Sequence, residues 1–282
     1  MFTPKGKLIP IGGSENKDFH ESGDCRKSFY STGILKRLIS EMHGAESRIE
    51  LVPTASGIPE EVVQRYIRAF DKLGCYNVGV MPIQNREDAL SQDYIDRLNC
   101  SDGVFFTGGN QSRLGKFFND TPFAQTLFER YMNDDFVIAG TSAGAMAMGH
   151  TMITGGTATS FKRGDVETAT GLSFIDNVIV DTHFIERGRF GRLTQTVAAN
   201  PVCIGIGLGE DTGLIISNGS DMEVIGSGQV IIFDGHAMKH EKGTDVSLNI
   251  SIKDMAVHVL KMKDTYILKE RDYGPKRAAM AS

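Results

Sequence analysis

The sequence has few of the features that mark secreted, membrane-spanning or nucleic-acid-binding proteins. Its four cysteines are scattered without CxxC spacing, so we expect reduced thiols and no disulfide framework. No run of about 18 apolar residues occurs, which excludes a membrane-spanning helix. The first residues also lack the apolar core of an export signal. We therefore expect a cytoplasmic protein with no membrane partner.

Basic residues are in deficit as well. The 30 lysines and arginines face 35 aspartates and glutamates, which gives a net charge of -5 at pH 7. Binding to a phosphate backbone relies on a basic surface, so nucleic acid is not expected as a partner. The 282 residues and 40% hydrophobic content suit one large α/β domain with a sizeable core. We expect this domain to span residues 1–270, with a loose, polar tail over 271–282.

Short apolar runs alternate with amphipathic stretches up to about residue 215, a pattern typical of βαβ units around a buried parallel sheet. Strands are predicted at 7–11, 48–52, 78–81, 103–106, 136–140, 178–181, 203–208 and 213–217. Helices are predicted at 31–42, 58–73, 88–98, 111–119 and 121–132, with another near 145–148. From about residue 220 the pattern changes to hairpin-like runs at 222–225, 229–233, 246–248 and 265–268. These runs predict a β-rich extension over about 220–270.

A serine stands at the corner between a predicted strand and a predicted helix. Strand 136–140 is followed by Thr141, Ser142, Ala143 and Gly144. Small residues permit a sharp turn there, and a helix N-terminus supplies free N–H groups and a positive dipole end. Ser142 therefore suits a nucleophile, and the N–H of Ala143 suits an oxyanion donor. The alternative is that Thr141 or Ser142 only caps the helix.

A histidine follows the end of predicted strand 178–181. Sites in open α/β sheets form at this edge, and imidazole is the usual general base near neutral pH, so His183 suits the base for a serine nucleophile. Arg187, Arg189 and Arg192 follow it, and arginine forks bind carboxylates bidentately. The alternative is a solvated helix start in which the arginines pair with Glu186.

Two further strand ends carry groups that suit acyl transfer. Glu210 and Asp211 follow strand 203–208, and either carboxylate could orient the imidazole of His183, although a turn with solvated acids has the same pattern. Gly108 and Gly109 follow strand 103–106, and their unhindered amides could complete an oxyanion hole.

Motifs for metals and nucleotides are missing. The histidines lack ligand spacing such as HExxH, so neither a metal site nor a cofactor is predicted. The glycine pair at 12–13 follows the first strand but belongs to neither GxGxxG nor GxxxxGK[ST], which argues against a nucleotide loop.

Taken together, five segments resemble the cyanophycinases, in a serine peptidase family that also contains bacterial aspartyl dipeptidases. They are GGSENK at 12–17 (GGAEDK in the family), TGGNQ at 107–111, GTSAGA at 140–145, DTHFIERGRFGRL at 181–193 and GIGLGEDT at 205–212. They follow the family's order at similar spacing over nearly the whole chain. The resemblance implies a flavodoxin-like parallel-sheet core, related to class I glutamine amidotransferases, with a C-terminal β-hairpin extension.

The resemblance also implies an activity and its residues. Matched by position, Ser142 is the nucleophile, His183 the base and Glu210 the acid that orients the base. The implied reaction is cofactor-free hydrolysis of cyanophycin, a poly-aspartate with arginine on its side chains, to β-Asp-Arg dipeptides from the C-terminal end. The implied assembly is a homodimer. The matching pocket residues are Gln111, Asp181, Arg187, Arg189 and Arg192, and Thr182 occupies a further substrate-binding position.

Those pocket residues are expected to divide by charge. The arginines would clamp substrate carboxylates, while Asp181 and Glu15 are predicted to bind the substrate guanidinium. Thr182 departs from the family, which usually has glutamine there. A shorter side chain without an amide offers different hydrogen bonds, so the specificity is open to change while the chemistry is not.

Other functions fit parts of the same pattern. An aspartyl or β-aspartyl dipeptidase of altered specificity is the first alternative. A non-catalytic peptide-binding protein on the same scaffold is the second, although the presence of Ser142, His183 and Glu210 argues against it. A glutamine amidotransferase would need cysteine in place of Ser142.

Overall fold

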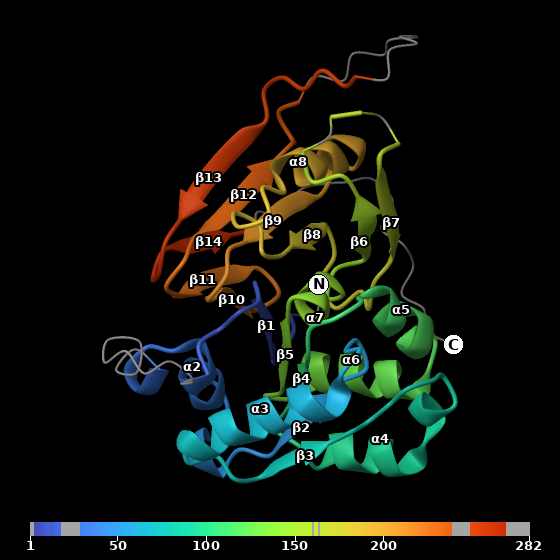
Figure 1. Ribbon diagram of the computed structural model, residues 1–282, viewed down its shortest axis with the longest axis vertical. Coiled ribbons are helices and arrows are strands. Elements are labelled where there is room, and N and C mark those ends of the chain that lie inside the picture. Colours follow the sequence, from blue (N-terminus) through green and yellow to red (C-terminus); the bar gives the residue numbers. More distant parts are fainter. Residues whose placement is uncertain (1–2, 18–28, 160, 163, 239–248, 269–282) are drawn as a thin grey trace.

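Two sheets organise the chain in the computed structural model, which describes residues 3–17, 29–159, 161–162, 164–238 and 249–268. The larger sheet has eight strands in the order β14-β11-β10-β1-β5-β4-β2-β3. The smaller has four in the order β13-β12-β9-β8, and β6 and β7 form a two-stranded sheet. Figure 1 shows the parallel strands of the larger sheet in the lower part of the molecule and the four-stranded sheet above them.

Five neighbouring strands of the larger sheet run parallel to one another. They are Lys7–Ile11 (β1), Ile49–Val52 (β2), Val78–Val80 (β3), Gly103–Phe106 (β4) and Val137–Thr141 (β5). The antiparallel strands Thr212–Ser217 (β10), Asp221–Gly226 (β11) and Thr265–Ile267 (β14) extend the sheet beyond β1. All five parallel strands therefore end at one edge, where the loops that follow them meet.

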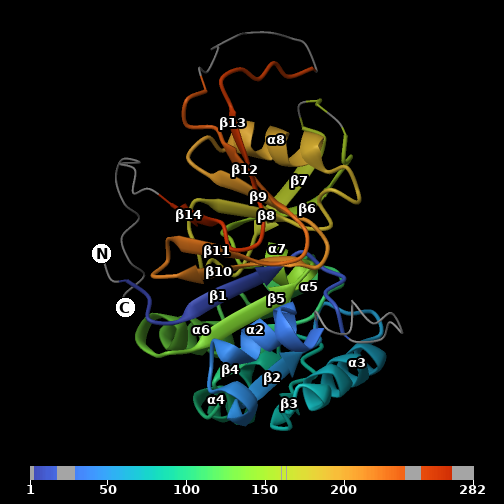
Figure 2. The same ribbon diagram turned by 90° about the vertical axis from the view of Figure 1, so that its left-hand side faces the viewer.

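Helices cover both faces of the parallel strands (Figure 2). One face carries Ile34–Ser40 (α2) and Pro59–Lys72 (α3), and the other carries Gln92–Asn99 (α4), Ser112–Phe118 (α5) and Pro122–Asn133 (α6). Side chains alternate between the faces, so Phe105 contacts Tyr66 and Phe70 of α3 while Phe106 contacts Phe118 of α5. Because both faces are buried, these strands read as short, nearly continuous apolar runs.

Local sequence explains where these helices begin. Proline occupies the first turn of α3 and of α6, where its missing N–H costs nothing. The Thr121 hydroxyl accepts a hydrogen bond of 3.3 Å from the Ala124 amide and caps α6. Glu60 and Glu61 lie in the first turn of α3, at the positive end of the helix dipole. Short 3₁₀ turns stand before β2 and α4, at Gly44–Glu46 (η1) and Asp88–Leu90 (η2).

The four-stranded sheet shares a core with the larger one. It comprises Val178–Asp181 (β8), Ile204–Leu208 (β9), Val230–Asp234 (β12) and Ala256–Leu260 (β13). Ile206 and Ile232 face the cluster that also holds Phe106 and Phe118, while Phe233 faces the helix α8 on the opposite side. The remaining elements are Ala143–Met146 (α7), Thr151–Gly156 (β6), Val166–Thr170 (β7) and Phe190–Ala199 (α8).

The connections of the parallel sheet reverse direction between β2 and β4. From β2 the chain moves outward through α3 to β3, whereas from β4 it moves the other way through α5 and α6 to β5. The strands β2 to β5 thus follow the flavodoxin-like order, and the N-terminal β1 fills the place next to β5. Such a reversal leaves a crevice at the carboxyl ends of the two strands that flank it.

The structure confirms the predicted α/β class with a largely parallel core and a C-terminal β region. The structure differs from the prediction in the assignment of the later strands to the two sheets. The strands β8 and β9 join the smaller sheet and β10 runs antiparallel, while the β region after residue 220 is divided between both sheets. The predicted strand 246–248 and the predicted tail 271–282 lie outside the described residues. No helix in the described part of the chain is long and apolar enough to cross a membrane.

Candidate active site

Ser142 stands at the sharp turn between β5 and α7. Its backbone has φ 51° and ψ -109°, a conformation that non-glycine residues seldom adopt. Gly140 and Gly144 make the turn possible, since a Cβ on Gly140 would lie 2.6 Å from the carbonyl carbon of Gly144. Within the described part of the chain, the Ser142 hydroxyl makes no capping hydrogen bond to α7 and contacts a histidine instead. The turn therefore presents the hydroxyl to a partner across the sheet edge.

A chain of two hydrogen bonds joins Ser142, His183 and Glu210. The Nε2 atom of His183 lies 3.0 Å from Ser142 Oγ, and its Nδ1 atom lies 2.6 Å from Glu210 Oε1. The Glu210 amide in turn donates to the Glu186 carboxylate at 3.1 Å. The neighbouring Asp211 bonds elsewhere, because its carboxylate accepts hydrogen bonds from the Asn16 amide and the Ser227 hydroxyl. Of the two acids in this loop, Glu210 is the one in contact with the imidazole.

Three successive carbonyls at the end of β1 hold the backbone of the site. Ile11 accepts from the amide of Ser142, and Gly12 and Gly13 accept from those of His183 and Asp211, each at 2.9 Å. All three donors belong to residues with positive φ, at 51°, 46° and 46° in that order. Such backbone costs about 1–3 kcal/mol per residue and persists only where the surroundings hold it. The end of β1 therefore fixes the three loops relative to one another.

Gly13 also lies flat against the His183 ring. A Cβ built on this glycine would stand 2.4 Å from Cε1 and 2.5 Å from Nε2 of His183, and the glycine has φ +103°. Any side chain here would displace the imidazole from Ser142, so this position requires glycine.

The oxyanion side of the site is formed by β4 and α7. Ala143 begins α7, so its N–H is one of the first-turn amides that have no acceptor within the helix. Gly108 lies beside the serine, because a Cβ built on it would come within 3.4 Å of Ser142 Cβ and 3.9 Å of Ser142 Oγ. Gly109 has φ +144° and packs against the Ala55 carbonyl. The two glycines thus leave open the space beside the Ser142 hydroxyl.

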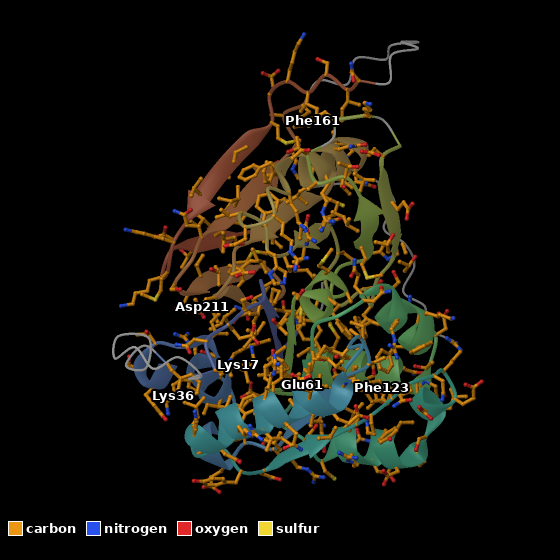
Figure 3. All side chains as sticks on the ribbon, viewed as in Figure 1. Lys17, Lys36, Glu61, Phe123, Phe161 and Asp211 are labelled. Atoms are coloured by element: carbon orange, nitrogen blue, oxygen red, sulfur yellow. The ribbon has the colours of Figure 1, made fainter. Side chains whose placement is uncertain are left out.

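Glu15 is buried beneath the nucleophile turn. Its carboxylate accepts a hydrogen bond of 2.7 Å from the Thr141 hydroxyl and another from the Tyr66 hydroxyl. It also forms an ion pair of 3.1 Å with Lys17. Only 1% of its side chain is exposed. Figure 3 shows Lys17 on the same flank of the molecule as Asp211. The carboxylate predicted for a substrate guanidinium is therefore occupied by groups of the protein itself.

The charge of Glu15 shapes the titration of this cluster. Burial acts to raise the pKa of Glu15, but the charge of Lys17 and the hydrogen bonds from Tyr66 and Thr141 outweigh burial, so the pKa lies below the ordinary glutamate value. Burial and the adjacent carboxylate raise the pKa of Tyr66 well above its usual range. At neutral pH the cluster holds an ionised carboxylate next to a neutral phenol.

Asp181 is enclosed by two of the three predicted arginines. Arg192 binds both of its oxygens, with Nε 2.6 Å from Oδ2, and Arg189 donates to Oδ1 at 3.2 Å. Asp181 and Arg192 are both buried. Arg189 also donates to the Thr182 carbonyl at 2.7 Å, and burial lowers its pKa despite the neighbouring aspartate. This cluster fixes the strand end that carries His183.

The other predicted pocket residues differ in exposure. The Gln111 side-chain nitrogen donates to the Ile153 carbonyl at 2.7 Å, which ties the start of α5 to β6. Thr182 is fully buried, and its hydroxyl has no hydrogen-bond partner among the described residues. Arg187 is exposed on the turn before α8, and its side chain has no partner in the described part of the chain.

Sequence reasoning did not identify Tyr66 or the supporting contact of Glu186. Tyr66 lies at one of the apolar positions of α3, where its pattern is that of an ordinary core residue. Glu186 lies inside the motif that carries His183, where its sequence position suggests only a partner for the arginines. Neither role has a sequence signal, because each depends on which loops the fold brings together.

A serine at a strand-to-helix turn, bonded to a histidine that is bonded to a carboxylate, is the arrangement found in serine hydrolases. A model of peptidase family S51 matches residues 20–224, and the chain belongs to this family.

The named proteins that are similar to this chain are cyanophycinases and a peptidase. The chain is 35% identical to a cyanophycinase of Trichormus variabilis over 281 residues, which cover 98% of this chain and 91% of the relative. It is 32% identical to a cyanophycinase of Geminocystis herdmanii, with 93% of each chain covered. A solved peptidase structure from an acI-B1 Actinobacterium shares the fold, with a TM-score of 0.65 at 22% identity over 95% of this chain and 99% of that one.

Proposed function

We propose that this protein is a cyanophycinase, a serine exopeptidase that hydrolyses cyanophycin to β-Asp-Arg dipeptides. One observation carries the proposal: the Ser142–His183–Glu210 chain, with contacts of 3.0 Å and 2.6 Å, occurs in a member of family S51 that matches cyanophycinases along nearly its whole length. Cytoplasmic location and a homodimeric assembly belong to the same proposal.

In the proposed reaction Ser142 Oγ attacks the peptide carbonyl while His183 Nε2 takes the hydroxyl proton. Glu210 orients the ring and stabilises its charged form. The N–H groups of Ala143 and of Gly108 or Gly109 bind the oxyanion of the tetrahedral intermediate. His183 then gives the proton to the leaving amine, and a water molecule activated by the same histidine hydrolyses the acyl-enzyme and releases the acid.

The predicted substrate ligands divide into two groups in this proposal. Gln111 and the exposed Arg187 are retained as substrate-binding residues, whereas the fully buried Thr182 is proposed to act on substrate only through its neighbours Asp181 and His183. Glu15 and Asp181, together with Arg189 and Arg192, are proposed to position the catalytic loops, because their charged atoms already bind one another or neighbouring groups of the protein. The guanidinium of the substrate then needs another anionic partner.

The experiment that tests the proposal follows product sizes during digestion of insoluble cyanophycin. An exopeptidase releases β-Asp-Arg from the first minutes, while the remaining polymer shortens slowly. Release of intermediate fragments would contradict exopeptidase action. Hydrolysis of short aspartyl dipeptides in the absence of polymer degradation would favour the dipeptidase alternative.

A further inference from the structure

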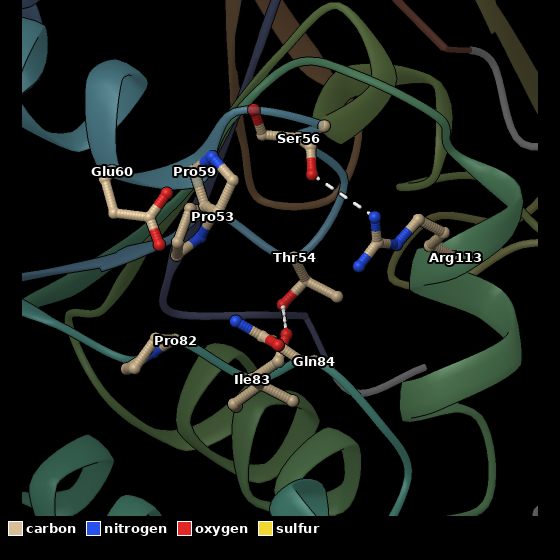
Figure 4. A pocket seen from close by; sticks show the side chains of 10 residues that line it. Pro53, Thr54, Ser56, Pro59, Glu60, Pro82, Ile83, Gln84 and Arg113 are labelled. Atoms are coloured by element: carbon tan, nitrogen blue, oxygen red, sulfur yellow. Dashed lines mark hydrogen bonds between the residues drawn. The ribbon is translucent and has the colours of Figure 1, made fainter.

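A pocket of about 270 Å³ lies at the point where the sheet connections reverse. Its walls come from the loop after β2 and the first turn of α3, from the loop after β3, and from the first turn of α5, which follows β4 (Figure 4). Open α/β sheets bind ligands at this position, outside the carboxyl ends of the strands that flank the reversal. Of the catalytic residues, Ser142 follows β5 at the same edge of this sheet, whereas His183 and Glu210 follow β8 and β9 of the four-stranded sheet.

Two opposite charges face each other across this pocket. Glu60 lies on one side beside Pro59, and Arg113 lies on the other, with the side chains of Thr54 and Gln84 between them (Figure 4). The Arg113 guanidinium donates to the Ser56 carbonyl at 3.2 Å. Among the described residues, neither Glu60 nor Arg113 has an oppositely charged partner. The pocket therefore offers an anion and a cation to one ligand.

Comparison with the neighbouring Glu61 shows that a glutamate at the start of α3 does not by itself face the pocket. Both glutamates lie in the first turn of α3, where the helix dipole favours acids. Glu61 forms an ion pair with Arg65 one turn further along the same helix and does not line the pocket. Glu60 lines the pocket.

The pocket is coupled to the oxyanion loop. The Asn110 amide donates to the Ala55 carbonyl at 2.8 Å, so the loop that carries Gly108 and Gly109 rests on the pocket wall. Two strand spacings of about 4.8 Å separate β5, which carries the nucleophile, from β2, which carries the pocket. The distance along the edge is thus roughly 10 Å, or about three residues of extended chain.

We infer that this pocket is a subsite for a more distant repeating unit of the polymer, two or three residues away from the bond that is cleaved. The inference rests on the proposed function. Each side chain of cyanophycin ends in an arginine joined through its α-amino group, so it carries a free carboxylate and a guanidinium. Arg113 binds the carboxylate and Glu60 the guanidinium, while the prolines beside Glu60 contact the methylene groups. A two-unit substrate is too short to fill the catalytic site and this pocket together.

The test compares kcat/KM for synthetic cyanophycin fragments of two and six units. The wild-type enzyme is expected to prefer the six-unit fragment. The variants Glu60→Gln and Arg113→Ala are each expected to reduce the six-unit to two-unit ratio of kcat/KM about tenfold, the effect of losing one charge-assisted contact. Glu61→Gln on the same helix and Lys116→Ala on the same helix as Arg113 serve as matched controls and should keep the wild-type ratio.

Three results would overturn the inference. An unchanged ratio in both pocket variants removes the subsite and leaves the proposed function intact. An equal loss on both fragments means that Arg113 and Glu60 support the oxyanion loop without binding a distant unit. A wild-type enzyme that cleaves neither fragment refutes the proposed function, and the subsite with it.

Discussion

Thr141 stands one residue before the proposed nucleophile, and its hydroxyl donates a hydrogen bond of 2.7 Å to the carboxylate of Glu15. Tyr66 and Lys17 bind the same carboxylate, so a buried charge joins the loop after β1, the helix α3 and the end of β5. This contact explains why the acidic side chain of Glu15 is buried although the residues on either side of it are at least partly exposed. It also separates two roles for Glu15, because a substrate ligand mainly affects KM and a positioning residue mainly affects kcat.

We therefore predict that Glu15→Gln lowers kcat by about 10- to 100-fold, a size typical of small displacements of catalytic groups, with KM on cyanophycin fragments changed far less. Thr141→Val should act in the same direction, and Thr141→Ser should keep activity because it retains the hydroxyl. Steady-state kinetics on the two-unit fragment provides the measurement. A raised KM with normal kcat in Glu15→Gln would show that the carboxylate binds substrate after all.

The stability of the Glu15 cluster should depend on pH. The folded protein holds the pKa of Glu15 below its ordinary value, so the ionised carboxylate stabilises the folded state above the unfolded pKa, and this contribution is lost as pH falls through the folded pKa. The gap in unfolding free energy between wild type and Glu15→Gln should be full at pH 7 and shrink below about pH 4.3. Urea unfolding across this range measures it.

The exposed Glu61 is the matched control for that titration. Its carboxylate is 56% exposed and pairs with Arg65 on the helix surface, so Glu61→Gln should change stability little at any pH. A gap for Glu15→Gln that stays constant or grows on acidification would contradict the account of the buried cluster.

Gly13 provides a prediction about the histidine. In Gly13→Ala the new methyl group would stand 2.4 Å from His183 Cε1, which must move the ring away from Ser142. We expect kcat to fall about 100-fold. Gly74→Ala is the matched control, because Gly74 also has positive φ, at +79°, but has nothing within 4 Å of the added carbon. Both variants should lose about 1 kcal/mol or more of stability, and only Gly13→Ala should lose activity. Equal activity in the two variants would contradict the packing of Gly13 against the ring.

Asp181 should be one of the more costly positions for stability. Asp181→Asn leaves the buried Arg192 without its counter-charge, which typically costs about 3–5 kcal/mol. Asp221→Asn on β11 is a comparison with a partly buried aspartate that binds only neutral groups among the described residues, and it should cost less. Urea unfolding of both variants decides the matter. A loss below about 1 kcal/mol in Asp181→Asn would mean that the arginine cluster is not a structural clamp.

Much of the fold and of the site could be predicted from the sequence, because short apolar runs indicate buried strands and the site residues follow those runs. Strands 7–11, 103–106 and 178–181 have the predicted bounds. The hairpin β6–β7 and the strand β13 were missed, since their residues are largely polar or exposed and lack a clear alternation. The pattern also says nothing of which sheet a strand joins, so the separation of β8 and β9 from the larger sheet needed the structure.

The active site could likewise be predicted only in part from the sequence. Ser142, His183 and Glu210 each stand at a strand end, so their types and places could be read from the sequence. The internal partners of Glu15 and Asp181 could not, because a carboxylate in a motif looks the same whether it meets substrate or a buried arginine. Only the distances decide, and they pair Asp181 with Arg192 and Glu15 with Tyr66.

Ser142 is the proposed nucleophile of a cyanophycin-degrading peptidase, and its replacement by alanine tests that role. The most direct measurement incubates insoluble cyanophycin with wild-type protein and with Ser142→Ala, and follows β-Asp-Arg by mass spectrometry. We expect steady release by the wild type and a loss of at least about 10³-fold in the variant, which should remain folded. Release at a near-normal rate by Ser142→Ala, or no release by the wild type, would contradict that role.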